Sequence, residues 1–215
     1  MSYSQYGQDT WVLDLLGENG FFLDIGSYDP IEYSNTYLLE KEHNWKGICI
    51  EAQEDECKKY SNIRNCIIIN ALVDSEIYDA QFIVYKGLSG IIKNFSEFDK
   101  NRLLNKTQFK GKKLEDLSIN IRTSLLVDIL KQCEIPNVID YVSLDIEGSE
   151  LRVLKTFPWD KFHINTMTIE HNRLPEYFNE IRTYMKSKDF IVLGNYLSDN
   201  EDCFINKTIK RVIHV

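Results

Sequence analysis

Four acidic residues stand at or near the ends of short apolar stretches. Glu51, Asp145 and Glu170 each end one stretch, and Asp24 lies near the end of another. If the stretches are strands of one parallel sheet, their carboxyl ends meet at one edge, where open α/β sheets bind ligands. A single acid there commonly caps the next helix by accepting hydrogen bonds from its free amides. Four acids on one edge instead indicate a binding site.

The turn at residues 24–29 reads Asp-Ile-Gly-Ser-Tyr-Asp and holds one of the three glycines of the dinucleotide fingerprint. A pyrophosphate needs close backbone approach at a helix N-terminus, so this turn disfavours an NAD-dependent oxidoreductase. A ligand with an ammonium, a carboxylate and a ribose tolerates a looser turn beside an acid. Glu51 lies one strand-helix-strand unit after Asp24, where an acid can accept both ribose hydroxyls. S-adenosylmethionine has these groups.

The elements that must position these acids follow from the alternation of apolar runs with segments of helical periodicity. This alternation predicts an α/β fold, and runs that are apolar on both faces are typical of buried parallel strands. The predicted strands are residues 21–26, 47–51, 67–73, 141–145 and 166–170. The predicted helices are residues 34–43, 55–61, 124–133, 149–157 and 175–187.

Two further segments are rich in strand-forming residues. The runs at 190–193, 203–205 and 211–213 follow one another without a helix between them, which predicts an antiparallel hairpin or meander. Residues 78–93 hold another such stretch with Gly87 and Gly90, which we expect to form a small excursion beside the sheet.

Composition limits the classes of function and the compartment. The chain has 215 residues, 43% of them hydrophobic, and a net charge of −8, which predicts one globular domain over residues 1–215, possibly cut from a longer protein. The acidic excess argues against nucleic acid as a partner and favours cationic over anionic ligands. Five cysteines without C-x-x-C spacing disfavour a disulfide framework and a zinc ribbon. With no leader and no membrane span in the sequence, we expect a cytoplasmic protein.

Five segments together resemble the FkbM family of S-adenosylmethionine-dependent O-methyltransferases. They are residues 4–9 (SQYGQD), 22–26 (FLDIG), 34–36 (SNT), 45–51 (WKGICIE) and 144–150 (LDIEGSE), and the likeness extends from Ser4 to about Phe204. The resemblance implies a Rossmann-like class I methyltransferase fold, with a seven-stranded, mostly parallel sheet, an antiparallel last strand and helices on both faces. It also implies methyl transfer to a hydroxyl, often on a sugar or a polyketide.

The resemblance assigns the cofactor site position by position. Asp24 and Gly26 would border the methionine end, Glu51 the ribose, and Ala71 with Leu72 the adenine. Gln5 and Gln8 would fold over the methionine carboxylate, or else form the cap and polar face of a first helix. Ser27 stands where the family often has another small residue, so its contact with the cofactor stays open. The expected cofactor-binding residues are Gln5, Gln8, Asp24, Gly26, Ser27, Glu51, Ala71, Leu72 and Asp145.

Two mechanisms for activating the acceptor hydroxyl remain open at this stage. Asp145, Glu147 or His171 could take the proton directly as a general base. Alternatively, Asp145, Glu170 and His171 could hold Mg²⁺ or Mn²⁺, which would lower the pKa of the hydroxyl. This second arrangement is similar to that of small-molecule O-methyltransferases that use magnesium.

The expected acceptor is a hydroxyl of a sugar or glycan in an uncharged or weakly charged molecule, with neither nucleic acid nor a membrane as partner. Two alternatives remain: a non-catalytic nucleotide- or glycan-binding module of the same fold, and an O-methyltransferase of a polyketide-type small molecule. The oligomeric state has no signal in the sequence.

Overall fold

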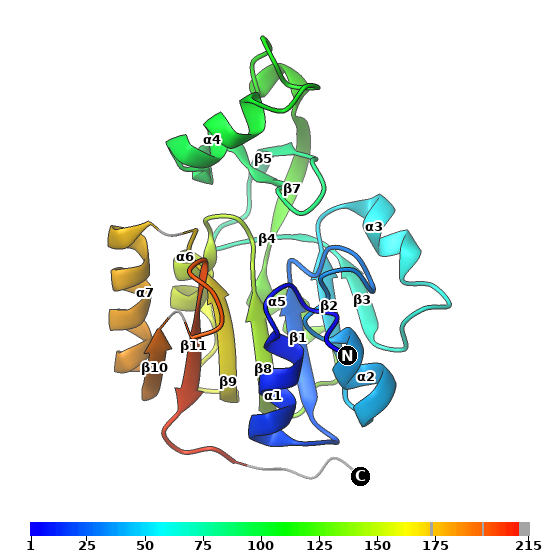
Figure 1. Ribbon diagram of the computed structural model, residues 1–215, viewed down its shortest axis with the longest axis vertical. Helices are drawn as coiled ribbons and strands as arrows, with labels where there is room; N and C mark the ends of the chain where they lie inside the picture. Colours follow the sequence, from blue (N-terminus) through cyan, green and yellow to red (C-terminus); the bar gives the residue numbers. More distant parts are fainter. Residues whose placement is uncertain (173, 195, 211–215) are drawn as a thin grey trace.

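A computed structural model describes residues 1–172, 174–194 and 196–210 (Figure 1). Its main sheet has seven strands in the order β10-β11-β9-β8-β1-β2-β3. All neighbouring pairs from β9 to β3 are parallel, whereas β11 runs antiparallel to β9 and β10. The strands are β1 (Phe21–Ile25), β2 (Lys46–Glu51), β3 (Ile67–Asn70), β8 (Val138–Leu144), β9 (His163–Glu170), β10 (Phe190–Gly194) and β11 (Glu201–Asn206).

This sheet confirms the predicted class I methyltransferase arrangement, including the antiparallel last strand. The expected strand at 211–213 lies outside the described residues. The edge strand β3 differs from the expectation of burial on both faces, because Ile67 is 48% exposed. Only β2 flanks β3, so side chains at this edge have fewer neighbours to cover them.

Helices cover both faces of the main sheet, as predicted (Figure 1). Alternate side chains of β1 point to opposite faces. Leu23 belongs to the apolar cluster that includes side chains of α5, α6 and α7, and Phe22 belongs to the cluster that includes side chains of α1 and α2. In the described part of the chain, no helix is long and apolar enough to cross a membrane. The helices of these layers are α1 (Gln8–Leu16), α2 (Tyr37–His43), α3 (Glu54–Lys59), α5 (Leu126–Lys131), α6 (Glu150–Thr156) and α7 (Pro175–Ser187).

A small lobe, residues 72–125, lies above the main sheet in Figure 1. It holds a second sheet of order β4-β7-β5-β6 and its own apolar cluster around Ile83 and Leu103. Its elements are β4 (Leu72–Asp74), β5 (Asp79–Ile83), β6 (Gly90–Ile91), η1 (Ile92–Asn94), α4 (Glu97–Leu104), η2 (Glu115–Leu117) and β7 (Ile119–Leu125).

Two element boundaries predicted from the sequence are wrong because of the small lobe. The predicted strand at 67–73 is divided at Ala71 between β3 of the main sheet and β4 of the lobe. The predicted helix at 124–133 begins at Leu126, because Thr123 to Leu125 pair with β4 as the end of β7. The excursion is therefore a four-stranded sheet with a helix, larger than the predicted segment at 78–93.

Candidate functional site

Two adjoining cavities lie at the carboxyl ends of the central strands and share Gly26, Tyr28, Gly87 and Asp145. The first, here the apolar chamber, has a volume of about 440 Å³ and includes Ile50, Glu51, Ala71, Leu72 and Phe82 in its wall. The second, here the acidic chamber, has a volume of about 650 Å³ and includes Gln5, Gln8, Asp24, Asn35, Glu170 and Glu201. The predicted cofactor residues thus line one continuous cleft.

Gly26 allows β1 and β8 to meet at the junction of the chambers. Its φ is +84°, and a Cβ on this residue would lie 1.6 Å from the backbone oxygen of Asp145. The amide of Asp145 donates to the oxygen of Ile25 at 3.0 Å, which holds the two strand ends together. Only glycine accommodates both this conformation and this approach.

Glu51 closes the apolar chamber with a carboxylate held by backbone donors. Its Oε2 accepts from the amide of Tyr28 at 2.8 Å, and its Oε1 accepts from the amide of Gln53 at 2.7 Å. The side chain is buried, and this burial raises its pKa. An ionised carboxylate offers about four acceptor positions, so each oxygen keeps capacity for a further donor such as one of two vicinal hydroxyls.

The remaining wall of the apolar chamber suits a flat, apolar ring. Ala71 and Leu72 lie where β3 passes into β4, and the amide of Ala71 donates to the oxygen of Glu51 at 3.0 Å. Phe82 reaches the chamber from β5 of the small lobe. The position of Phe82 in the chamber wall could not be predicted from the sequence, because it depends on how the lobe folds over the main sheet.

Asp24 lies in the acidic chamber, 3% exposed, and accepts from Thr36 Oγ1 at 2.8 Å. Burial raises its pKa to about 6, against the opposing influence of Thr36 and Arg64. Arg64 in turn donates to Thr36 Oγ1 at 3.0 Å and forms a fully buried ion pair with Glu40. The structure therefore confirms that Asp24 faces the cleft, and it shows the buried network that fixes its direction.

The Ser-Asn-Thr segment supports this network from the start of α2. Ser34 Oγ accepts from the amide of Tyr37 at 3.1 Å, and Asn35 Nδ2 donates to Ser143 Oγ at 2.9 Å. The three consecutive polar side chains thus connect the helix start with β1 and β8.

Gln5, Gln8 and Ser27 differ in exposure and in whether their side chains already contact other residues. Gln5 is exposed at the mouth of the acidic chamber, whereas Gln8 is 3% exposed and its side chain contacts Tyr6 and Glu201. The Ser27 hydroxyl accepts from Tyr60 Oη at 2.8 Å. Ser27 therefore contributes to the wall of the acidic chamber while its hydroxyl is engaged by Tyr60.

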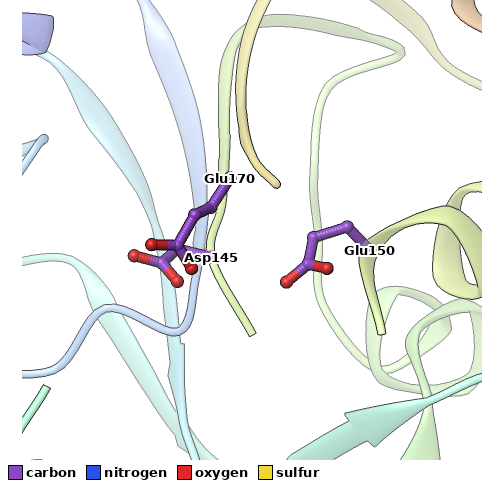
Figure 2. Close-up of side chains that lie close together, drawn as sticks. All are labelled: Asp145, Glu150 and Glu170. Atoms are coloured by element: carbon purple, nitrogen blue, oxygen red, sulfur yellow. The ribbon is translucent and has the colours of Figure 1, made fainter. Parts of the chain in front are cut away.

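The carboxyl groups of Asp145, Glu150 and Glu170 lie near one another (Figure 2). Asp145 lines both chambers and Glu170 lines the acidic chamber, whereas Glu150 lines neither. One oxygen each of Asp145, Glu150 and Glu170 lies within 4.8 Å of the other two. Burial raises the pKa of all three groups, and that of Glu170 is raised well above its usual range by the nearby Asp145 and Glu147 as well. The nearby charge of Asp145 thus favours the protonated form of Glu170.

Glu150 has a structural task within this cluster. Its Oε1 accepts from the amides of Ile146 and Gly148 at 3.0 and 3.1 Å, and its Oε2 accepts from Tyr177 Oη at 2.6 Å. The loop that it holds has a φ of +55° at Glu147 and +101° at Gly148. Glu150, which sequence analysis did not select, anchors the strained loop after β8.

Glu147 and His171, expected as catalytic groups, line neither chamber. Glu147 is 5% exposed, accepts from Asn172 Nδ2 at 3.1 Å, and has a pKa raised well above its usual range by burial. His171 is 2% exposed, with Nε2 3.5 Å from Asp202 and its ring against Phe178. Consecutive residues at a strand end point in opposite directions, so Glu170 faces the cleft and His171 does not. The predicted ligand group of Asp145, Glu170 and His171 is therefore not brought together.

Glu201, the first residue of β11, was missed by sequence analysis. It pairs with Glu170 across the β9–β11 ladder and lines the acidic chamber at 7% exposure. Burial raises its pKa to about 7. No strand precedes it directly, so its place at the edge follows only from the antiparallel direction of β11, which brings the start of that strand to the carboxyl ends of the others.

Comparison with known proteins identifies the family. Residues 24–192 match the family described as the methyltransferase FkbM domain, and the chain belongs to this family. Among solved structures, it is similar to that of M. capricolum TrmK in complex with the cofactor product S-adenosyl-homocysteine. That match has 15% identity and a TM-score of 0.44, and it covers 95% of this chain and 68% of TrmK. No curated protein matches the chain.

Proposed function

We propose that residues 1–215 act as one domain that transfers the methyl group of S-adenosylmethionine to a hydroxyl of a sugar or glycan. One observation carries the proposal. An apolar chamber with Glu51 in its wall meets an acidic chamber, and Asp145 with its partner Glu170 lies at the junction. This juxtaposition offers a nucleoside site, a second site for the acceptor, and a proton acceptor between them.

The chain has groups for each part of the cofactor. Ala71, Leu72 and Phe82 would enclose the adenine, and Glu51 would accept hydrogen bonds from the ribose hydroxyls. Asp24 and Gly26, with Gln5 at the mouth, would border the methionine portion. The sulfonium would then lie near Asp145, because Asp145 belongs to both chambers.

The bound cofactor supplies an electrophilic methyl group on a sulfonium. An acceptor oxygen attacks that methyl carbon, the carbon–sulfur bond breaks with its electron pair returning to sulfur, and the hydroxyl proton leaves. Holding oxygen and methyl in line lowers the barrier. Glu170, whose pKa is raised well above its usual range by burial and by Asp145, would stay protonated, so the Asp145 carboxylate would remain to accept the hydroxyl proton.

A divalent cation is the alternative to direct proton transfer. Asp145 and Glu170 have the oxygen donors that Mg²⁺ and Mn²⁺ prefer, but Glu150, the third group of the cluster, already accepts from two amides and a tyrosine hydroxyl. His171 faces Asp202. The donor set therefore fits a metal poorly, and the proposed proton transfer does not use one.

The proposal places the enzyme in a reducing compartment, such as the cytoplasm. All five cysteines are free thiols. Of these, Cys49 and Cys203 are buried in strands of the main sheet, where they act as small apolar side chains.

The test uses labelled S-adenosylmethionine with a panel of methyl glycosides and nucleotide sugars, followed by calorimetry with S-adenosylhomocysteine. Asp145→Asn should lower turnover by about 10²- to 10⁴-fold, the range for loss of a general base, and leave product affinity within about threefold. Asp160→Asn is the matched control, because Asp160 is exposed and lies in the turn that follows α6.

Three outcomes separate the alternatives. Wild-type turnover in Asp145→Asn would remove Asp145 from the mechanism. Loss of turnover in chelator-treated protein, with recovery on adding Mg²⁺ or Mn²⁺, would replace direct proton transfer by a metal. Tight binding of S-adenosylhomocysteine without transfer to any acceptor would identify a non-catalytic binding module.

A further inference from the structure

The side of the acidic chamber formed by β9 and β11 holds two carboxyl groups, Glu170 and Glu201. The two residues are directly paired in the antiparallel ladder, which sets their Cβ atoms about 5 Å apart on the same face. Asn200 and Tyr6 complete this side, with Asn200 Nδ2 donating to Tyr6 Oη at 2.7 Å. We call these four residues the acceptor wall.

Glu201 is buried with an oxygen left for a ligand. The residue is 7% exposed, and its side chain contacts that of Gln8. Its Oε1 is buried and has no hydrogen-bond partner within the described residues. A buried acceptor without a donor is unfavourable, so a ligand that brings a donor to Oε1 would gain affinity from this contact.

The acceptor wall lies beyond the cofactor. In the main sheet, β11 is separated from β1 by β9 and β8, which is about 14 Å at the usual spacing of parallel strands. The proposed nucleoside site lies on the opposite side of β1, over β2 and β3, where Glu51 and Ala71 stand. The adenine and ribose therefore lie away from Glu201, and we assign the part of the acidic chamber at Glu201 to the acceptor.

The charges around the acidic chamber have one sign. Asp24, Asp145, Glu170 and Glu201 all contribute to its wall, and no Lys or Arg is among the described residues that line it. A neutral hydroxyl would bring one donor to Glu201 and no compensating charge. A protonated amine brings up to three donors and a positive charge, which would stabilise the ionised form of the buried Glu201 carboxyl group.

We propose that the acceptor carries a protonated amine near the hydroxyl that is methylated, as an amino sugar does, and that Glu201 binds this amine. The inference rests on the proposed function and narrows its acceptor class. It replaces the expectation from the sequence of an uncharged or weakly charged acceptor, and it agrees with the preference of an acidic protein for cationic ligands.

The experiment compares matched sets of sugars, each set containing a free amino sugar, its N-acetyl form and the parent sugar with a hydroxyl at that carbon. Label transfer is measured for wild type, Glu201→Gln and Glu180→Gln. The glutamine at 201 keeps the shape and the contact with Gln8 but not the charge, and Glu180 is an exposed residue of α7 that controls for loss of one charge. Affinity for S-adenosylhomocysteine is measured in parallel.

Wild type should methylate a free amino sugar with a kcat/KM at least tenfold above the values for its two neutral analogues. Glu201→Gln should lose at least tenfold in kcat/KM for the amine, change less than threefold for the neutral analogues, and keep its affinity for S-adenosylhomocysteine. Glu180→Gln should behave as wild type.

Equal or better transfer to the neutral analogues would overturn the inference while leaving the methyltransferase proposal in place. A tenfold loss of S-adenosylhomocysteine affinity in Glu201→Gln would also overturn it, because Glu201 would then bind the cofactor. A wild-type protein that binds no S-adenosylhomocysteine and methylates no sugar would instead contradict the proposed function itself.

Discussion

The close approach of β1 and β8 at Gly26 makes Gly26→Ala the sharpest test of the site geometry. The new Cβ would lie 1.6 Å from the oxygen and 2.8 Å from the carbonyl carbon of Asp145. The carbonyl would have to move by about 1.8 Å to reach the 3.4 Å at which ordinary contacts begin. Such a movement pulls against the 3.0 Å hydrogen bond from Asp145 to Ile25.

Three contributions set the size of the effect. A left-handed conformation costs a non-glycine residue roughly 1–2 kcal/mol. Overpacking of a tight site adds roughly 1–3 kcal/mol, and a buried hydrogen bond left unmade adds a similar amount. We expect Gly26→Ala to lower the free energy of unfolding by about 3–8 kcal/mol, the sum of these ranges and a large part of the total stability of a domain.

Gly111→Ala is the matched control. Gly111 has a φ of +76°, close to that of Gly26, but a Cβ there would meet no atom within 4 Å. This control should therefore cost only the conformational part, about 1–2 kcal/mol. Urea unfolding followed by circular dichroism measures both variants, and calorimetry measures S-adenosylhomocysteine affinity in the folded protein. If the two variants lie within 0.5 kcal/mol of each other, the argument from close approach is wrong.

Three further predictions concern single groups. Glu51→Ala should weaken S-adenosylhomocysteine binding by about 1.5–3 kcal/mol through loss of charge-assisted hydrogen bonds; calorimetry that shows the same affinity as the exposed Glu54→Ala would contradict the placement of the ribose. Arg64→Met should lower the free energy of unfolding in urea by about 3–5 kcal/mol, because it leaves Glu40 as a buried, uncompensated charge. The control Arg122→Met removes an ion pair whose side chains are 67% and 73% exposed, and it should cost no more than about 1 kcal/mol in the same titration. Burial raises the pKa of Glu201 to about 7 in the fold, above its ordinary value of 4.5. The native state therefore binds the proton more tightly, and the free energy of unfolding should rise as the pH falls from 7 to 4.5. Glu201→Gln should lack this contribution, and identical pH profiles for the two proteins would show that Glu201 is not buried as described.

The main sheet could be predicted because each central strand has its signal within its own residues. Residues 21–26, 47–51 and 141–145 are short apolar runs bounded by turns, and β1, β2 and β8 occupy them with small shifts at their ends. The small lobe could not be predicted in the same way. The three residues Leu72 to Asp74 form β4 by pairing with Thr123 to Leu125. No pattern within residues 72–74 predicts a pairing strand about fifty positions away in the sequence.

The same difference between local and tertiary signals separates the site residues that could be predicted from those that could not. Asp24 and Glu51 lie at or near the ends of β1 and β2, and Asp145 directly follows β8. The rule that ligands bind at the carboxyl ends of strands therefore predicts their position from the sequence alone. His171 was misplaced because residue adjacency does not say which neighbour faces the cleft, and Glu170 takes that direction. Phe82 and Glu201 were missed because they come from the small lobe and from an antiparallel strand, whose ends reach the site only through the tertiary arrangement.

This division explains why the cofactor side of the site is more predictable than the acceptor side. The cofactor groups depend on β1, β2 and the turns that follow them, where the chain has little freedom once Gly26 fixes the approach of Asp145. The acceptor wall depends on the register between β9 and β11, and a shift of one residue would turn Glu201 away from Glu170 and place Asn200 or Asp202 opposite Glu170 instead. If the proposed acceptor site is right, substitutions at the start of β11 should change the choice of acceptor without disturbing the groups proposed to hold the cofactor.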